Sequence, residues 1–139
     1  MSRRSRAREV ALQLLYEDDL NPGRATAAIE QFLDGRLKDE DLVVFAQGLV
    51  SGVRRNRDEL DALLTKCADN WSLARMAVTD RNILRLGAYE LLYTQAPPRV
   101  AINEAVELAK RFGAKQSAQF VNGVLDRFLQ ERARMAPEE

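Results

Sequence analysis

The chain has 139 residues, of which 46% are hydrophobic and 30% are charged, a balance typical of a globular domain rather than a disordered or membrane-spanning chain. Its 21 basic and 21 acidic residues cancel, so any attraction to nucleic acid must come from local clusters. The sequence contains no histidine, which removes the most common general base and metal ligand and argues against most enzyme classes.

All four prolines lie between periodic segments, which is typical of a helical protein. The apolar spacing predicts a first helix from about Ser2 to Asp19, which ends at the turn sequence of residues 21–23. A short second helix is expected from Thr26, acting as its N-cap, to Gly35.

Two further helices are expected in the proline-free stretch that follows. Asp39 or Asp41 caps the third helix, which is predicted to reach Arg57. Asp58 is predicted to open the fourth helix, which continues through Cys67.

Two glycines, Gly48 and Gly52, lie one helical turn apart within the third predicted helix. Glycine inside a helix costs about 0.5 to 1 kcal/mol relative to alanine, so the pair indicates a face that another helix backbone approaches closely. The alternative is that the two glycines arose by neutral drift and that no helix approaches this face.

The fifth predicted helix has two possible N-caps, Ser72 and Thr79. Its apolar residues surround most of the helix circumference, which predicts that it is the central and most buried helix. Asp80 lies near its start, where a carboxylate complements the helix dipole.

The last two helices follow the break at Pro97 and Pro98. One is expected over residues 101–112, with Gly113 at its C-terminal end, and the other begins at Ser117. Residues 132–139 are expected to form a frayed tail. Because no segment shows the alternation of a half-buried strand, the sequence predicts an all-α fold with about seven helices.

Four arginines, Arg3, Arg4, Arg6 and Arg8, precede the first acidic residue, Glu9. Cations at a helix N-terminus oppose the helix dipole and cost about 0.3 to 1 kcal/mol each when exposed, so an anionic partner is expected to compensate for them. Guanidinium groups bind phosphates with paired N–H groups and stack on bases, which favours RNA. A solvated basic tail is the alternative interpretation.

A second basic cluster, Lys110, Arg111 and Lys115, lies at the junction of the last two helices, where the start at Ser117 exposes backbone N–H groups. This arrangement could hold a phosphate, although cations near a helix C-terminus are also ordinary dipole compensation. The sequence contains neither a glycine-rich phosphate loop nor metal ligands at a spacing that closes a site. We therefore expect no cofactor, metal or catalytic residue.

The chain is expected to be a single domain over residues 1–139 and to act in the cytoplasm. No apolar run approaches the roughly 20 residues that a membrane span requires. The basic N-terminus also lacks the apolar stretch of a signal peptide.

Two C-terminal motifs carry a family resemblance: VAINEAVELAK over residues 100–110 and FVNGVLD over residues 120–126. Together with RARE at residues 6–9 and ILRL at residues 83–86, they resemble the N-utilisation substance B (NusB) family along essentially the whole chain. The resemblance implies an all-α, NusB-like fold of two packed small helical bundles.

The resemblance also implies a transcription antitermination factor that is not an enzyme. Members of the family bind the boxA element of ribosomal RNA leader transcripts together with the tenth small-subunit ribosomal protein (NusE). They help the transcription elongation complex to read through terminators, which promotes ribosomal RNA transcription. The family includes both monomers and homodimers, so a homodimer stays open here.

The resemblance assigns three sets of residues to these partners. Two regions are expected to bind RNA: Arg3, Arg4, Arg6, Arg8 and Tyr16 in the first helix, and Lys110, Arg111, Gln116 and Phe120 near the last junction. Asp80 and Arg85 fall where the family meets the ribosomal protein.

Two other functions remain open from the sequence. One is an RNA-binding accessory domain related to those of RNA methyltransferases. The other is a helical protein-interaction adaptor without an RNA role, in which the basic start is only a tail. Salt-dependent binding to an RNA oligomer separates the adaptor from an RNA-binding protein.

Overall fold

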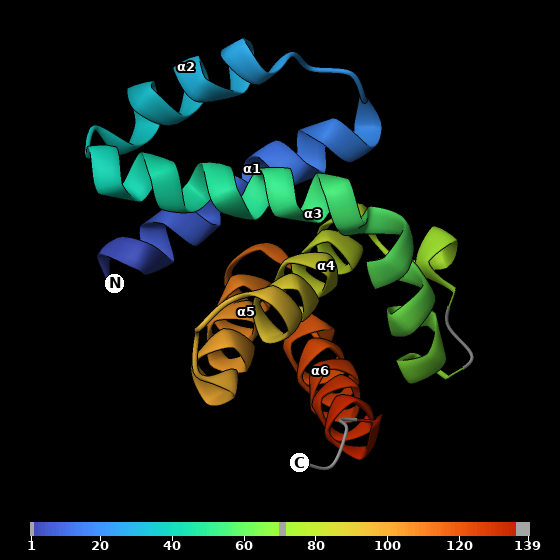
Figure 1. The fold of residues 1–139 in the computed structure, drawn as a ribbon. Coiled ribbons are helices and arrows are strands. Elements are labelled where there is room, and N and C mark those ends of the chain that lie inside the picture. The colour runs from blue at the N-terminus through green and yellow to red at the C-terminus, as the bar shows by residue number, and fades with distance from the viewer. Residues whose placement is uncertain (1, 70–71, 136–139) are drawn as a thin grey trace. The chain divides into compact units, whose positions relative to one another are not determined.

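The computed structural model describes residues 2–69 and 72–135, and every regular element in these ranges is helical (Figure 1). The elements are α1 (Arg3–Leu20), α2 (Thr26–Leu37), α3 (Glu40–Cys67), a 3-10 turn (Leu73–Arg75), α4 (Val78–Tyr93), α5 (Pro98–Phe112) and α6 (Ser117–Met135). The chain divides into two compact units, unit 1 over residues 1–55 and unit 2 over residues 56–139. The all-α class and the two small bundles are therefore as the sequence predicts.

Unit 1 is a three-helix assembly of α1, α2 and the first half of α3. Helix α1 packs against α2, and their side chains are joined where Arg36 donates to Gln13 Oε1 at 3.2 Å. Arg54 on α3 forms a forked ion pair with Asp18 on α1, with Nε 2.7 Å from one carboxylate oxygen. The buried apolar side chains of the unit include Ala7, Val10, Ala11, Leu14, Leu15, Ile29, Leu33, Ala46, Leu49 and Val50.

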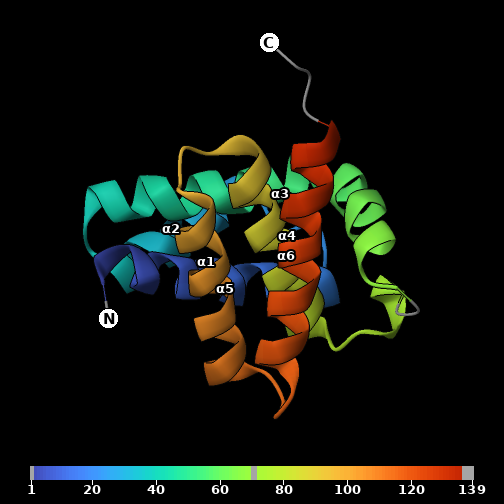
Figure 2. The ribbon, with the colours of Figure 1, turned by 90° about the horizontal axis from the view of Figure 1, so that it is seen from below.

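Unit 2 is built around α4, which contacts both α5 and α6, while α5 and α6 also pack against each other (Figure 2). Nearly every residue of α4 from Asn82 to Leu91 is buried, because its apolar residues surround the helix. The expectation that this is the central helix is confirmed for unit 2. The second half of α3 joins α4 through an ion pair between Asp61 and Arg85.

Gly87 explains how α4 approaches its neighbours so closely. A Cβ atom at this position would lie 2.7 Å from Leu125 Cδ1 on α6 and 3.4 Å from Ala105 Cβ on α5. Leu125 is fully buried and has little room to move. In contrast, a Cβ atom at Gly48 on α3 would meet nothing within 4 Å, so the close helix approach predicted at that glycine is wrong.

Replacing Gly87 with valine is expected to lower the free energy of unfolding by about 1 to 3 kcal/mol, since the added atoms overpack a filled interior. Gly48→Val is the matched control, because the same side chain there enters open space on a helix. Its expected effect is about 0.5 kcal/mol or less. Chemical denaturation of both variants measures the difference, and equal effects at the two glycines would contradict the packing argument.

Several boundaries differ from the sequence prediction. The third and fourth predicted helices are one continuous helix, α3, so Asp58 lies inside it rather than at a cap. Pro98 is the first residue of α5 instead of part of the break, because proline lacks the N–H that a first-turn residue leaves unpaired. The helix α6 extends to Met135, so residues 132–135 are helical and not frayed, whereas residues 136–139 of the expected tail lie outside the described residues.

Cys67 is 3% exposed, and burial raises the pKa of its thiol, as expected for a packing residue. Among residues 2–69 and 72–135, no three histidine, cysteine, aspartate or glutamate side chains are grouped as a metal site would require. In the same part of the chain, none of the helices has the length and apolar character that crossing a membrane demands.

Candidate nucleic-acid interface

The first turn of α1 carries three arginines and contains no acidic residue of its own. Ser2 caps this helix, and its hydroxyl accepts a hydrogen bond from the backbone N–H of Ser5 at 3.0 Å. Arg3, Arg4 and Arg6 project from the first turn with exposed side chains. The helix is therefore capped and ordered from its start, which argues against the loose basic tail considered from the sequence.

The three exposed arginines differ in their partners. Arg3 pairs with Asp39, and Arg6 pairs with Glu9 at 3.1 Å. No ion pair or side-chain hydrogen bond engages the Arg4 guanidinium among the described residues, and this group lies over the Phe45 ring, 4.9 Å from its centroid. Exposed ion pairs stabilise little, so an RNA phosphate could replace the carboxylate partners of the other two arginines.

Asp39 has a second task at this end of unit 1. Its carboxylate accepts hydrogen bonds from the backbone N–H groups of Asp41 and Leu42, at 3.0 and 3.3 Å, and so caps α3. The hydrogen bond from Leu42 and the nearby Arg3 guanidinium hold the pKa of Asp39 below its usual value. Of the two caps that the sequence allowed, the structure selects Asp39, and its charge keeps Arg3 close to the start of α3.

Arg8 differs in burial from the arginines with which the sequence grouped it as RNA-binding. It is only 4% exposed, and its guanidinium lies 5.2 Å from the centroid of the Phe45 ring. The signal was present in the sequence: Arg8, Ala11 and Leu15 are spaced i, i+3, i+7, which puts Arg8 on the buried stripe of α1. Arg8 is therefore part of the folded interior of the chain.

Tyr16 is 39% exposed on the third turn of α1 beyond the arginines. At 100° and 1.5 Å per residue, it lies about 80° around the helix and about 15 Å along it from Arg6. The two side chains therefore share one broad side of α1, and Tyr16 offers an aromatic ring on that side.

The second predicted cluster lies at the end of α5 and the start of α6 in unit 2. Lys110 and Arg111 are exposed in the last turn of α5, where Lys110 pairs with Glu107 at 3.2 Å and Arg111 lies over the Phe112 ring at 5.1 Å. These contacts are with neighbours on the same helix, and they leave the charged ends of both side chains at the surface.

The junction between α5 and α6 is held tightly. Gly113 ends α5 with extended backbone, and a Cβ atom there would lie 2.5 Å from Ser117 Cβ and 2.7 Å from the Ala109 carbonyl oxygen. Glycine is needed here for space rather than for a left-handed conformation. The buried Ser117 hydroxyl accepts a hydrogen bond from the Ala114 N–H at 2.8 Å, which fixes the start of α6.

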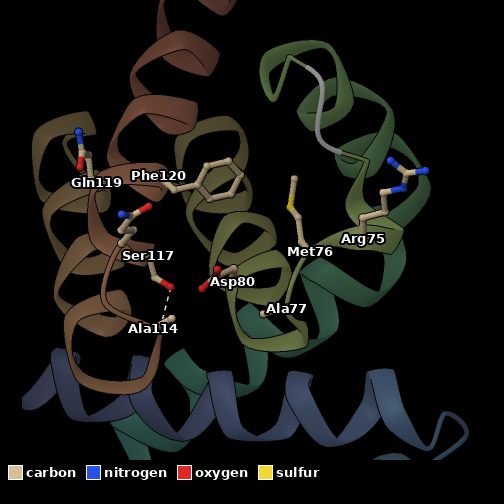
Figure 3. Close-up of a pocket in the computed structure, with 9 residues that line it drawn as sticks. Arg75, Met76, Ala77, Asp80, Ala114, Ser117, Gln119 and Phe120 are labelled. Atoms are coloured by element: carbon tan, nitrogen blue, oxygen red, sulfur yellow. Dashed lines mark hydrogen bonds between the residues drawn. The ribbon is translucent and has the colours of Figure 1, made fainter.

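A pocket of about 420 Å³ opens beside this junction (Figure 3). Gln116 and Phe120 line it together with Asp80 of α4, whereas Lys110 and Arg111 are not among its lining residues. Figure 3 shows the Phe120 ring extending across the pocket toward the Met76 side chain. The structure thus brings two of the predicted RNA residues next to a predicted protein-partner residue.

Asp80 has an unusual environment in this pocket. Its Oδ1 atom is buried and accepts no hydrogen bond from the described residues. A buried acceptor without a donor is costly, so this oxygen is suited to an N–H or O–H group supplied by a bound molecule. The aromatic ring of Phe120 adds a stacking surface on the same pocket.

Sequence reasoning missed Arg75, Met76 and Gln119, which also line the pocket. Gln119 lies three residues after Gln116, a spacing that places both on one side of a helix start. The approach of residues 75–77 to α6 depends on tertiary packing and has no local sequence signal.

Arg85, for which contact with a protein partner was predicted, lies in the interior of the structure. Its side chain is 4% exposed, and Nε and Nη2 donate to the two carboxylate oxygens of Asp61 at 2.7 and 3.0 Å. Nη1 donates to Asn82 Oδ1 at 3.2 Å. These contacts assign Arg85 to the interior of unit 2.

The remaining candidate residues thus fall into two sets, one on unit 1 and one on unit 2. The first set consists of Arg3, Arg4, Arg6 and Tyr16 on α1. The second set consists of Asp80, Lys110, Arg111, Gln116 and Phe120 at the α5–α6 junction and its pocket.

The chain is similar to known proteins in both sequence and structure. The model of the NusB family matches residues 5–130. The transcription antitermination protein NusB of Myxococcus xanthus (strain DK1622) is 46% identical over 132 residues, which cover 91% of this chain and 94% of the relative. The corresponding protein of Trichlorobacter lovleyi is 42% identical over 127 residues, covering 91% and 89% of the two chains.

Solved structures give the same result. T. maritima NusB superposes with a TM-score of 0.82 at 36% identity, covering 94% of this chain and 92% of that one. A crystal structure of the antitermination factors NusB and NusE in complex with dsRNA contains a chain with a TM-score of 0.84 at 28% identity, covering 94% and 98%. The family match over residues 5–130 and the identity to the Myxococcus protein show that this chain belongs to the NusB family.

Proposed function

We propose that this chain is a transcription antitermination factor that binds RNA through the start of α1 and through the α5–α6 junction, without catalysing a reaction. The observation that carries the proposal is the first turn of α1, where exposed arginines stand at a helix N-terminus with no acid in that turn. Arg4 in particular has no acidic partner among the described residues. An anionic ligand relieves the repulsion between these charges and the helix dipole.

The family membership supports the choice of RNA as that ligand. Relatives carry the name transcription antitermination protein, and a similar chain has been solved with NusE and dsRNA. We take the RNA to be the boxA element of nascent ribosomal RNA leader transcripts and the protein partner to be NusE, the tenth small-subunit ribosomal protein. In this proposal the chain acts in the cytoplasm, within the transcription elongation complex.

In this proposal, the pocket at the α5–α6 junction binds a base of the RNA. A splayed RNA base stacks on Phe120, and the Asp80 carboxylate that lines the same pocket accepts an amino or imino N–H from the base. Gln116 lines the same pocket and offers both a donor and an acceptor to the base edge. Lys110 and Arg111, on the adjacent turn of α5, neutralise phosphates of the same strand.

The test is a titration with boxA-like single-stranded RNA at several salt concentrations. The salt slope is the decrease in the logarithm of the binding constant per unit increase in the logarithm of the salt concentration. Each lost phosphate contact lowers this slope by about 0.7, so replacing Arg4 and Arg6 with alanine is expected to lower it by about 1.4. At about 0.1 M salt this corresponds to roughly 25-fold weaker binding. Arg8 is left intact because it is buried and its loss would disturb the fold.

The matched control replaces two exposed arginines outside the proposed surface, Arg99 and Arg134, which are 69% and 75% exposed. This variant removes the same charge and should keep the salt slope of the unmodified chain. An unmodified chain that binds boxA-like RNA no better than a scrambled oligomer, or without salt dependence, would support the protein-interaction adaptor instead.

A further inference from the structure

Phe45 connects the two arginines of α1 that face α3 in unit 1. It lies on α3 and is partly exposed, and the guanidinium groups of Arg4 and Arg8 lie over its ring at 4.9 and 5.2 Å from the centroid. Arg4 and Arg8 are one helical turn apart, about 40° around α1, so both reach the same side of the helix. One aromatic side chain therefore contacts two positive groups.

The two arginines at this ring have different surroundings. Arg8 is 4% exposed and belongs to the folded interior, whereas Arg4 is exposed at the helix start. Of the two guanidinium groups over the ring, that of Arg4 is therefore the one that a phosphate can reach.

A cation–π contact can fix the position of the Arg4 guanidinium without using its hydrogen-bond donors. A guanidinium stacked on a ring uses its flat face, and its N–H groups point outward along its edges. Those of Arg4 meet no protein acceptor within the described residues. By contrast, the guanidinium groups of Arg3 and Arg6 are turned toward Asp39 and Glu9.

We propose that Phe45 is a positioning residue of the RNA-binding surface: its ring holds the Arg4 guanidinium at the start of α1 with its N–H edges free to grip an RNA phosphate. This inference rests on the proposed RNA-binding function. It adds a residue that neither the basic clusters nor the family motifs point to, because Phe45 is an apolar position within a helix.

A second phenylalanine in unit 1 provides a matched comparison. Phe32 on α2 also carries two guanidinium groups, Arg36 at 4.7 Å and Arg24 at 6.0 Å from its centroid. Both of those arginines are already engaged by polar partners, Arg24 by Glu17 at 2.8 Å and Arg36 by Gln13 at 3.2 Å. Phe32 therefore has the same kind of contact without an uncommitted guanidinium.

The experiment measures the affinity of the full chain for boxA-like single-stranded RNA. Phe45→Leu removes the ring while nearly conserving side-chain volume, and it is expected to weaken binding about two- to fivefold, the range of an exposed cation–π contact. Phe45→Tyr restores the ring and should restore the affinity. Phe32→Leu, the matched control, should bind as tightly as the unmodified chain.

A double-substitution cycle separates positioning from a general loss of structure. In a chain that carries Arg4→Ala, adding Phe45→Leu should cause no further loss, because the group that the ring holds is gone. Arg4→Lys keeps the charge at the surface but loses the flat stacking group, so it should reproduce the two- to fivefold loss. Circular dichroism melting confirms that each variant is folded at the temperature of the titration.

The outcomes distinguish this inference from the function on which it rests. If Arg4→Ala weakens binding but Phe45→Leu does not, the positioning role is wrong while RNA binding by the arginines stands. The positioning role is also wrong if Phe45→Leu causes the same loss with and without Arg4. If the unmodified chain does not bind the RNA at all, the proposed function itself fails, and the inference fails with it.

Discussion

Replacing Phe128 with alanine is expected to lower the free energy of unfolding by about 3 to 5 kcal/mol, the range for losing a buried aromatic side chain. Phe128 lies on α6, is 4% exposed, and follows the buried residues Val124 and Leu125 on the same face. Since α6 packs against both α4 and α5, the surrounding helices cannot collapse into the space that the ring leaves.

Chemical denaturation of the full chain, followed by circular dichroism, measures this loss. Phe112→Ala is the matched control, because it removes the same side chain from a position that is 44% exposed. Its expected effect is below about 1 kcal/mol, as for most surface substitutions. A loss at Phe128 no larger than that at Phe112 would mean that Phe128 is not a core residue in solution.

The fold class could be predicted because the apolar period is local information. Each helix of the described chain has an apolar stripe or, for α4, an apolar circumference, and the prolines separate them. Helix ends were harder to predict, since a residue such as Asp58 is equally acceptable at a cap and on an exposed helix face. In the structure α3 continues through Asp58, because apolar residues on both sides of it, among them Val53 and Leu60, are buried.

The candidate site, too, could be predicted from the sequence only in part. The exposed arginines at the start of α1 could be predicted from charge alone, because no acidic residue lies in the first turn. The burial of Arg8 and Arg85 could not be read from charge, since a guanidinium stacked on a ring or paired with a carboxylate is stable in the interior. Arg8 had been assigned to RNA from the basic cluster and the family resemblance, and Arg85 to the protein partner from the resemblance alone.

The pocket was beyond local sequence reasoning for a different reason. It combines Asp80 of α4 and the adjacent segment around Met76 with Phe120 of α6, which is far from both in the chain. From the sequence, the Asp80 carboxylate was expected to complement the dipole of its helix and, through the family resemblance, to meet the protein partner. That its Oδ1 atom is left without a donor depends on the packing around it, which no spacing rule reports.

Replacing Asp61 with alanine is expected to lower the free energy of unfolding by about 3 kcal/mol, because it leaves the buried Arg85 guanidinium without its carboxylate. The lower end of the range for buried ion pairs applies, since the Asp61 side chain is 26% exposed while Arg85 is 4% exposed. Adding Arg85→Met to Asp61→Ala should recover most of the loss, because an apolar side chain of similar length fills the space without a charge.

Asp126→Ala is the control: it breaks an exposed pair with Arg99, 3.8 Å apart, and should cost less than about 1 kcal/mol. Denaturation of the three variants and the unmodified chain, with NusE binding measured alongside, separates the two roles considered for Arg85. If the double variant regains stability and still binds NusE, Arg85 has a structural role in the interior of unit 2. If it regains stability but no longer binds NusE, Arg85 contributes to the partner surface.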